Sequence, residues 1–269
     1  MVWRRRFRRP LLVTGASGFL GRHLVDAPGD WEVVAPTHAM VDLRHRDRTI
    51  EFISGWKPQA IAHLAYRKDR QSIVDVSRNV AEAAAACGAR LVHLSTDVVF
   101  GGRPLPYTEQ DEPFPIIEYG RDKLDAEHAV FAAAPGAVAL RTSLLYGTDR
   151  LSASQLDAQA AAQGRSSMTF FTDEVRCPTH AADVAAAIVA LAARPDVAGP
   201  LHLAGPRPMS RAEFAEINAA WLGLAPASIR TSTIESAGQV RPGHVVLDCA
   251  RAESLGLRCR DPFEALRRR

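Results

Sequence analysis

One segment near the amino terminus allows a first inference about the fold: Thr14-Gly15-Ala16-Ser17-Gly18-Phe19-Leu20-Gly21. It follows a short apolar run, Pro10–Thr14, and opens a stretch with helical spacing, Phe19–Val25. Glycines at three-residue intervals let the backbone turn sharply, approach a pyrophosphate and pack a helix closely against a sheet. Between a strand and a helix, this pattern predicts a dinucleotide-binding loop, with a simple turn as the alternative interpretation.

Short apolar runs alternate with helical patterns along the rest of the chain. We expect further buried strands at Glu32–Ala35, Ala60–Leu64, Arg90–Leu94, Val138–Arg141 and Leu201–Ala204. We expect helices at Arg48–Ser54, about 72–87, Leu124–Ala134 and Ala181–Ala192. Strand–helix alternation favours a parallel sheet with helices on both faces. Six such strands predict an α/β, doubly wound (Rossmann) fold.

The remaining segments are less regular and predict a second, smaller lobe. We expect residues 1–146 and about 181–204 to form the dinucleotide-binding domain. Residues about 147–180 and 205–269 would then form a discontinuous substrate-binding lobe. Within it, Ser210-Arg211-Ala212-Glu213 has the form of a capping box that begins a helix.

The charge distribution and the amino-terminal segment indicate which partners and which localisation to expect. The formal charge is +3, but arginines 4, 5, 6, 8, 9 and 267–269 carry eight positive charges at the two ends, so the remainder is mildly acidic. We interpret these ends as solvated termini and expect neither a nucleic-acid nor a membrane partner. The run after the basic leader is too short and glycine-rich for a signal peptide, so we expect a cytoplasmic protein.

The cysteines and histidines do not indicate a metal site. Cysteines 87, 177, 249 and 259 form no C-x-x-C pair, and the nine histidines show no ligand spacing. We therefore expect reduced structural thiols and no metal.

One pair of polar residues indicates acid–base chemistry. Among only four tyrosines and three lysines, Tyr119 and Lys123 are four residues apart at the start of a predicted helix, so they share a face. The pKa of a free tyrosine is about 10, too high for efficient proton transfer at neutral pH. A neighbouring ammonium favours the phenolate and lowers that pKa. A surface contact without chemistry is the alternative interpretation.

A third polar residue follows a predicted strand. Thr96 comes just after Arg90–Leu94, and ligands of doubly wound sheets bind beyond the carboxyl ends of the strands. Thr96 is therefore suited to hydrogen-bond a substrate carbonyl, although a strand-ending turn would use the same residue types. Thr96, Tyr119 and Lys123 resemble the Ser/Thr-Tyr-Lys constellation of short-chain dehydrogenase/reductases. The G-x-x-G-x-x-G spacing is similar to that of their extended members.

A narrower resemblance covers nearly the whole chain. The sequence is similar to dTDP-4-dehydrorhamnose reductases, which are sugar-nucleotide reductases. The similar segments are 94–102, 106–109, 119–127, 140–143, 177–179, 202–205 and 241–242. The resemblance implies reduction of a keto group on a nucleotide-linked sugar by a reduced nicotinamide cofactor. It also implies that Tyr119 donates the proton, that Lys123 tunes it and holds the nicotinamide ribose, and that Thr96 orients the oxygen.

Three departures from that family concern its sugar side. Val98 replaces the tyrosine of S-T-D-Y-V-F, Leu144 replaces the tryptophan of R-T-S-W-V-Y-G, and His63-Leu64-Ala65-Tyr66 replaces N-A-A-A-Y. We therefore keep the reaction class and widen the substrate to a related small ketone.

The end of the second predicted strand bears on the form of the cofactor. It reads Ala35-Pro36-Thr37-His38, without the carboxylate that NAD-selective folds place there. Arg22 and His38 would suit a 2′-phosphate, so NADP(H) is favoured over NAD(H). Asp42-Leu43 resembles the adenine-side contact of the family, or simply starts the next helix. The predicted cofactor-binding residues are Gly15, Ser17, Gly18, Phe19, Leu20, Gly21, Arg22, His38, Asp42, Leu43, Leu64, Ala65, Tyr66 and Lys123.

These observations predict an NAD(P)-dependent oxidoreductase, a ketoreductase acting on a small-molecule substrate, with a homodimer as the candidate assembly. A nucleotide-sugar epimerase on the same scaffold is one alternative. A dehydratase on this scaffold is disfavoured, because related 4,6-dehydratases show T-D-E, whereas this chain has Thr96-Asp97-Val98 and lacks the glutamate. The other alternative is a non-catalytic NADP-binding regulatory subunit, since the sequence also resembles the beta subunit of methionine adenosyltransferase.

Overall fold

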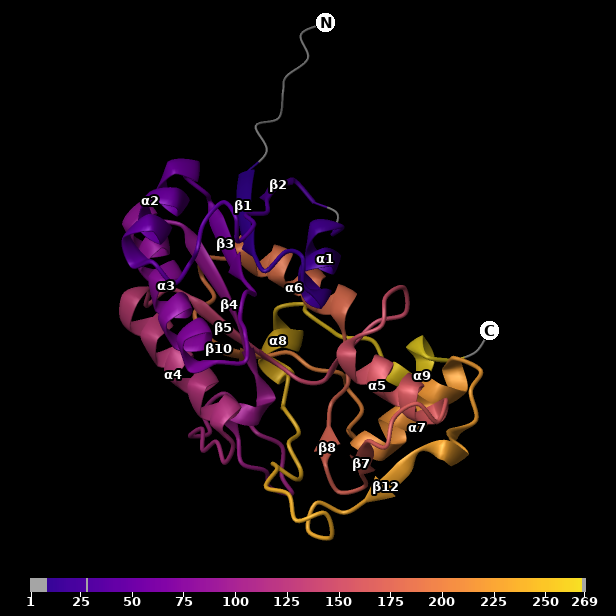
Figure 1. Cartoon of the computed structure of the whole chain (residues 1–269). Helices are drawn as coiled ribbons and strands as arrows, with labels where there is room; N and C mark the ends of the chain where they lie inside the picture. Colours follow the sequence, from indigo (N-terminus) through magenta and orange to yellow (C-terminus); the bar gives the residue numbers. More distant parts are fainter. Residues whose placement is uncertain (1–8, 28, 268–269) are drawn as a thin grey trace, which may run out of the picture. The chain divides into compact units, whose positions relative to one another are not determined.

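The computed structural model describes residues 9–27 and 29–267 (Figure 1). Six strands form one parallel sheet in the order β10-β5-β4-β3-β1-β2. They are β1 (Arg9–Thr14), β2 (Trp31–Val34), β3 (Ala60–His63), β4 (Arg90–Thr96), β5 (Val138–Thr142) and β10 (Gly199–His202). The predicted doubly wound, six-stranded α/β fold is confirmed. The basic leader, apart from Arg9, and the last two arginines lie outside the described residues.

The helices that connect these strands lie close to their predicted positions. They are α1 (Phe19–Val25), α2 (Arg46–Trp56), α3 (Val76–Cys87), α4 (Glu118–Ala133) and α6 (Ala181–Ala192). A π-helical turn, η1 (Gln71–Asp75), precedes α3, and a 3-10 turn, η2 (Asp97–Val99), follows β4. The start at Leu124 that the apolar pattern predicts is wrong, since α4 begins at Glu118. The helix includes Tyr119 and Lys123, as their spacing predicts.

The chain divides into two compact units, which we describe separately. The first unit runs to Leu94 and continues through Asp125–Ala139 and Ile188–Gly199. Its hydrophobic core contains Leu12 and Ile61 from β1 and β3, together with Val80 from α3. Helix α2 packs along α3 within this unit (Figure 1).

The second unit comprises Ser95–Leu124, Leu140–Ala187 and the chain from Pro200 onward. Three short strand pairs occur among its described residues: β6 (Leu145–Tyr146) with β9 (Thr179–His180), β7 (Thr169–Phe171) with β12 (Arg230–Ser232), and β8 (Val175–Arg176) with β11 (Met209–Ser210). Its further helices are α5 (Ala153–Ala162), α7 (Arg211–Trp221), η3 (Pro226–Ser228), α8 (Ala250–Ser254) and α9 (Pro262–Ala265).

The capping box predicted at Ser210 is confirmed. The Ser210 hydroxyl accepts a hydrogen bond from the Glu213 amide at 3.1 Å, and the Glu213 carboxylate accepts one from the Ser210 amide at 2.7 Å. A second capping box, at Ser152 and Gln155, begins α5 and was not predicted. No helix within residues 9–27 and 29–267 is long and apolar enough to cross a membrane. The assignment of the two predicted domains to cofactor and substrate stays a prediction.

Candidate functional site

The glycine loop lies at the point where the strand order of the sheet reverses. Strand β1 has β2 on one side and β3 on the other, so the connection from β1 to β2 and the connection from β2 to β3 run in opposite directions along the sheet. Ligands of doubly wound sheets bind outside the carboxyl ends of the strands at such a switch point. The loops after β1 and β3, which carry Gly15 and Ala65, are therefore the first candidates for ligand contact.

The position of Gly15 accepts only a residue without a side chain. Its φ of 73° is in the left-handed region, and a Cβ there would lie 2.7 Å from the Ala65 nitrogen. The loop after β1 thus rests directly on the loop after β3. On the other side, a Cβ at Gly21 would lie 2.2 Å from the Gly15 carbonyl oxygen, so α1 packs closely against the loop that precedes it.

The other predicted residues of this loop differ in exposure. Ser17 and Gly18 are exposed, Phe19 is half-buried and Leu20 is buried. Arg22 is exposed and turns back onto the loop, where its Nε donates to the Ser17 carbonyl at 3.0 Å.

The predicted adenine-side residues lie in the same compact unit. Arg44 binds both carboxylate oxygens of Asp42, with Nε 3.0 Å from Oδ1 and Nη2 2.6 Å from Oδ2. These hydrogen bonds hold the pKa of Asp42 well below its usual range, and the nearby His38 lowers it further. Asn79 of α3 donates to the Leu43 carbonyl at 2.9 Å and so fixes this turn.

The residues after β3 become progressively more exposed. Leu64 and Ala65 are half-buried, whereas Tyr66 is 47% exposed. The structure thus brings Gly15 and Ala65 into direct contact at the base of the loops and leaves the Tyr66 side chain accessible at the surface of its unit.

The predicted catalytic residues lie in the second unit. Thr96 is half-buried at the end of β4, and Lys123 is 5% exposed one helical turn beyond the half-buried Tyr119. Gly120 lies between Tyr119 and Lys123 on α4, and a Cβ at Gly120 would lie 2.2 Å from the Val98 carbonyl oxygen. The first turn of α4 therefore packs against the turn that follows Thr96. This contact brings the backbones that carry Thr96 and Tyr119 together.

A buried carboxylate beside Thr96 was not predicted as part of the site. Asp97 Oδ1 accepts from the Thr96 hydroxyl at 3.2 Å, and Oδ2 accepts from the Ser143 hydroxyl at 2.6 Å. The guanidinium Nε of Arg176 lies 3.7 Å from the same Oδ2. Burial raises the pKa of Asp97, and Arg176 opposes that effect. In the sequence, only the position of Asp97 next to Thr96 indicates that it belongs to the site, and no local pattern indicates Arg176.

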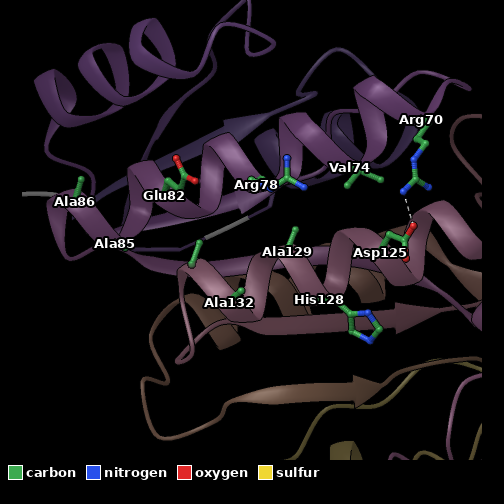
Figure 2. A pocket seen from close by; sticks show the side chains of 11 residues that line it. Arg70, Val74, Arg78, Glu82, Ala85, Ala86, Asp125, His128, Ala129 and Ala132 are labelled. Carbon is green, nitrogen blue, oxygen red and sulfur yellow. Dashed lines mark ion pairs between the residues drawn. The ribbon is translucent and has the colours of Figure 1, made fainter.

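An open groove of about 950 Å³ lies elsewhere, between α3 and α4 of the first unit (Figure 2). Five alanines line it, and an ion pair of 2.6 Å joins Arg70 to Asp125 at its edge. None of the sequence-predicted site residues lines this groove.

The sheet order and the glycine loop define a Rossmann-type member of the extended short-chain dehydrogenase/reductases. Within that class, the chain belongs to the family described as the RmlD substrate binding domain, whose model matches residues 9–268. The resemblance predicted from the sequence motifs is confirmed at this level.

Named relatives of two kinds are similar to the chain. Methionine adenosyltransferase 2 subunit beta from Pongo abelii is 33% identical, over 95% of this chain and 85% of the relative. The dTDP-4-dehydrorhamnose reductase of Mycolicibacterium smegmatis is 32% identical, over 95% and 83%. A crystal structure of dTDP-4-dehydrorhamnose reductase from Bacillus anthracis in complex with NADP superposes with a TM-score of 0.87 at 25% identity, covering 96% of this chain and 97% of that one.

Proposed function

We propose that the protein binds NADP(H) and reduces a carbonyl group, with the keto group of a nucleotide-linked sugar as the first candidate and a related small ketone as the second. The observation that carries this proposal is the arrangement on α4. Tyr119 and Lys123 share a helix face, and the turn that contains them packs against the turn after Thr96.

Each of the three residues has a distinct role in the proposed reaction. Bound NADPH would supply the hydride, which is chemistry that protein side chains lack. The Tyr119 hydroxyl donates a proton to the substrate oxygen as general acid. The Lys123 ammonium lowers the pKa of that hydroxyl and holds the nicotinamide ribose. Thr96 orients the substrate oxygen with its hydroxyl.

The residues of the first unit fit a dinucleotide. Gly15 adopts the left-handed turn that lets a loop backbone approach a pyrophosphate, and the exposed Ser17 and Gly18 leave that backbone accessible. The chain has no carboxylate at the end of β2, and the cationic Arg22 and the nearby His38 suit a 2′-phosphate. The NADP in the similar Bacillus anthracis reductase supports the same preference.

A second function is a regulatory, partner-binding subunit that keeps the cofactor site. The relatives named methionine adenosyltransferase 2 subunit beta support it, because those from Pongo abelii and Rattus norvegicus are 33% identical to this chain, against 32% for the named reductase, over the same 95% of its length. These relatives favour the regulatory subunit over the reductase, whereas the residues on α4 favour the reductase. Under this second function, the partner would be a methionine adenosyltransferase.

Two experiments separate these functions. The first measures NADPH and NADH oxidation by the purified protein with dTDP-4-dehydrorhamnose and with a panel of plain ketones. The second mixes the protein with methionine adenosyltransferase and measures complex formation by analytical ultracentrifugation. Turnover without a complex supports the reductase. Cofactor binding without turnover, together with a complex, supports the regulatory subunit, and conversion of a sugar nucleotide without net cofactor oxidation indicates an epimerase.

A further inference from the structure

A chain of buried hydrogen bonds joins the two loops at the switch point of the sheet. Thr14 is the last residue of β1 and His63 the last of β3, and the two are direct partners in the parallel register. The Thr14 hydroxyl lies 2.7 Å from Nδ1 of His63, and both residues are 1% exposed. On the far side of the ring, Nε2 lies 3.2 Å from the Ser77 hydroxyl of α3.

The neighbouring groups determine which atom donates each hydrogen. The Ser77 hydroxyl gives its one hydrogen to the Ile73 carbonyl at 2.5 Å, so it accepts from His63 Nε2–H. In the neutral imidazole, Nδ1 is then an acceptor and takes the Thr14 hydroxyl hydrogen.

The Thr14 oxygen in turn organises the loop after β3. It accepts from the Leu64 amide at 3.2 Å and from the Ala65 amide at 3.3 Å. Its two lone pairs and its hydrogen thus all have partners, and His63 supplies the acceptor that orients the hydroxyl. The ring of His93 stacks on His63 with centroids 5.4 Å apart, which fixes the plane of the imidazole.

The loops that this network joins have little freedom to adjust. Gly15 follows Thr14 directly, and a Cβ at Gly15 would lie 2.7 Å from the Ala65 nitrogen, so there is no room for a side chain between the two loops. A shift of Thr14 relative to Leu64 therefore moves the glycine loop against the loop after β3. A dinucleotide that contacts both loops is sensitive to that shift, because preorganised contacts lose affinity when their spacing changes.

We infer that His63 is a positioning residue for the dinucleotide: it orients the Thr14 hydroxyl and thereby sets the spacing between the glycine loop and Leu64–Ala65. This inference rests on the proposed binding of NADP(H), but not on catalysis. It applies equally to a reductase and to a regulatory subunit that keeps the cofactor. The same network stabilises the fold, so the test must separate affinity from stability.

The test measures the Kd for NADPH by fluorescence titration, and the Tm, for four single variants and for the double variant that combines Thr14→Val with His63→Phe. Thr14→Val removes the hydroxyl and keeps the shape, and His63→Phe removes both ring nitrogens and keeps a flat ring. His63→Asn retains an acceptor near the position of Nδ1. Val80→Ala is the control, because Val80 is fully buried in α3 and belongs to the hydrophobic core rather than to the network.

We expect Thr14→Val and His63→Phe each to raise the Kd about tenfold, measured well below the Tm of each variant. The double variant should bind no more weakly than either single one, since both disrupt one unit. His63→Asn should recover most of the affinity, and Val80→Ala should lower the Tm without changing the Kd. An unchanged Kd in Thr14→Val and His63→Phe, with a lower Tm, would overturn the inference while leaving cofactor binding intact. If the unchanged protein binds neither NADPH nor NADH, the proposed function is contradicted, and the inference with it.

Discussion

The hydroxyl of Ser143 lies 2.6 Å from Oδ2 of the buried Asp97, and this contact joins the ends of two neighbouring strands of the sheet. Ser143 follows β5 and Asp97 follows β4. The same hydroxyl accepts from the Cys177 amide at 3.1 Å, and Asp97 accepts from Thr96 at 3.2 Å. The carboxylate beside the proposed substrate-orienting threonine is therefore fixed by groups from distant parts of the sequence.

Loss of the Ser143 hydroxyl should destabilise the protein. Ser143→Ala leaves Asp97 without one donor and the Cys177 amide without its acceptor, which should lower the free energy of unfolding by about 1–3 kcal/mol. Thr142→Val is the adjacent control, because the Thr142 hydroxyl is buried and has no hydrogen-bond partner among the described residues. Thr142→Val should either change the free energy of unfolding by less than about 0.5 kcal/mol or increase it. Urea unfolding measures both, and equal effects of the two substitutions would contradict the role of the Ser143 hydroxyl.

A methyl group at Gly120 should disturb the start of α4. Gly120→Ala would place a Cβ 2.2 Å from the Val98 carbonyl oxygen, so the turn that carries Tyr119 must move. We expect a loss of about 1–3 kcal/mol in unfolding free energy and a larger loss of carbonyl reduction. Gly55→Ala is the control, since a Cβ at Gly55 of α2 meets nothing within 4 Å and alanine favours the helix by up to about 1 kcal/mol. Full activity and stability in Gly120→Ala would show that the packing is not required.

The arrangement of the sheet was predictable because its signals are local. Each buried strand is a short apolar run bounded by turn residues, and the glycine loop marks the end of β1. The two-residue strands of the second unit had no such signal, since β6 and β9 depend on pairing with a distant segment. The start of α4 at Glu118 was also missed, because the packing of Gly120 on Val98 is a tertiary contact.

The candidate site was predictable only in part, for the same reason. Tyr119 and Lys123 were found from their spacing, and Thr96 from its place after a strand. The roles of His63 and Asp97 depend on hydrogen bonds to Thr14 and Ser143, which the sequence does not place nearby. A histidine within the buried run Ala60–Leu64 and an aspartate after a strand were the available signals, and each also suits a merely structural role.

Selectivity for NADPH should depend on Arg22. Arg22→Ala removes an exposed guanidinium next to the glycine loop, so the Kd for NADPH should rise about tenfold while that for NADH changes little. Arg78→Ala provides the control, because Arg78 is an exposed arginine of α3 that pairs with Asp75 at 2.9 Å. Fluorescence titration with both cofactors measures the effect. An equal loss for NADPH and NADH would assign Arg22 to the shared part of the cofactor instead.

The buried thiol of Cys177 and the half-buried thiol of Cys249 should resist alkylation in the folded protein. Burial raises the pKa of Cys177 to about 11 and that of Cys249 to about 12. Few thiolates therefore form at about pH 8, and iodoacetamide should label these residues only as the protein unfolds. In each case the pKa of the folded protein exceeds that of the unfolded chain. The stability that the protonated thiols contribute is therefore complete below the unfolded pKa of 9.0 and is lost as the pH rises through the folded values. Mass spectrometry of protein labelled with and without urea tests the resistance to alkylation, and rapid labelling of Cys177 without urea would contradict it.

The most direct measurement compares the unchanged protein with Tyr119→Phe, following NADPH oxidation with dTDP-4-dehydrorhamnose and plain ketones alongside the Kd for NADPH. If Tyr119 donates the proton, the unchanged protein reduces at least one of these substrates. Tyr119→Phe should lose at least about a hundredfold in rate with an unchanged Kd. Tight NADPH binding by both proteins with turnover by neither, or equal turnover by both, would contradict a reductase that uses Tyr119.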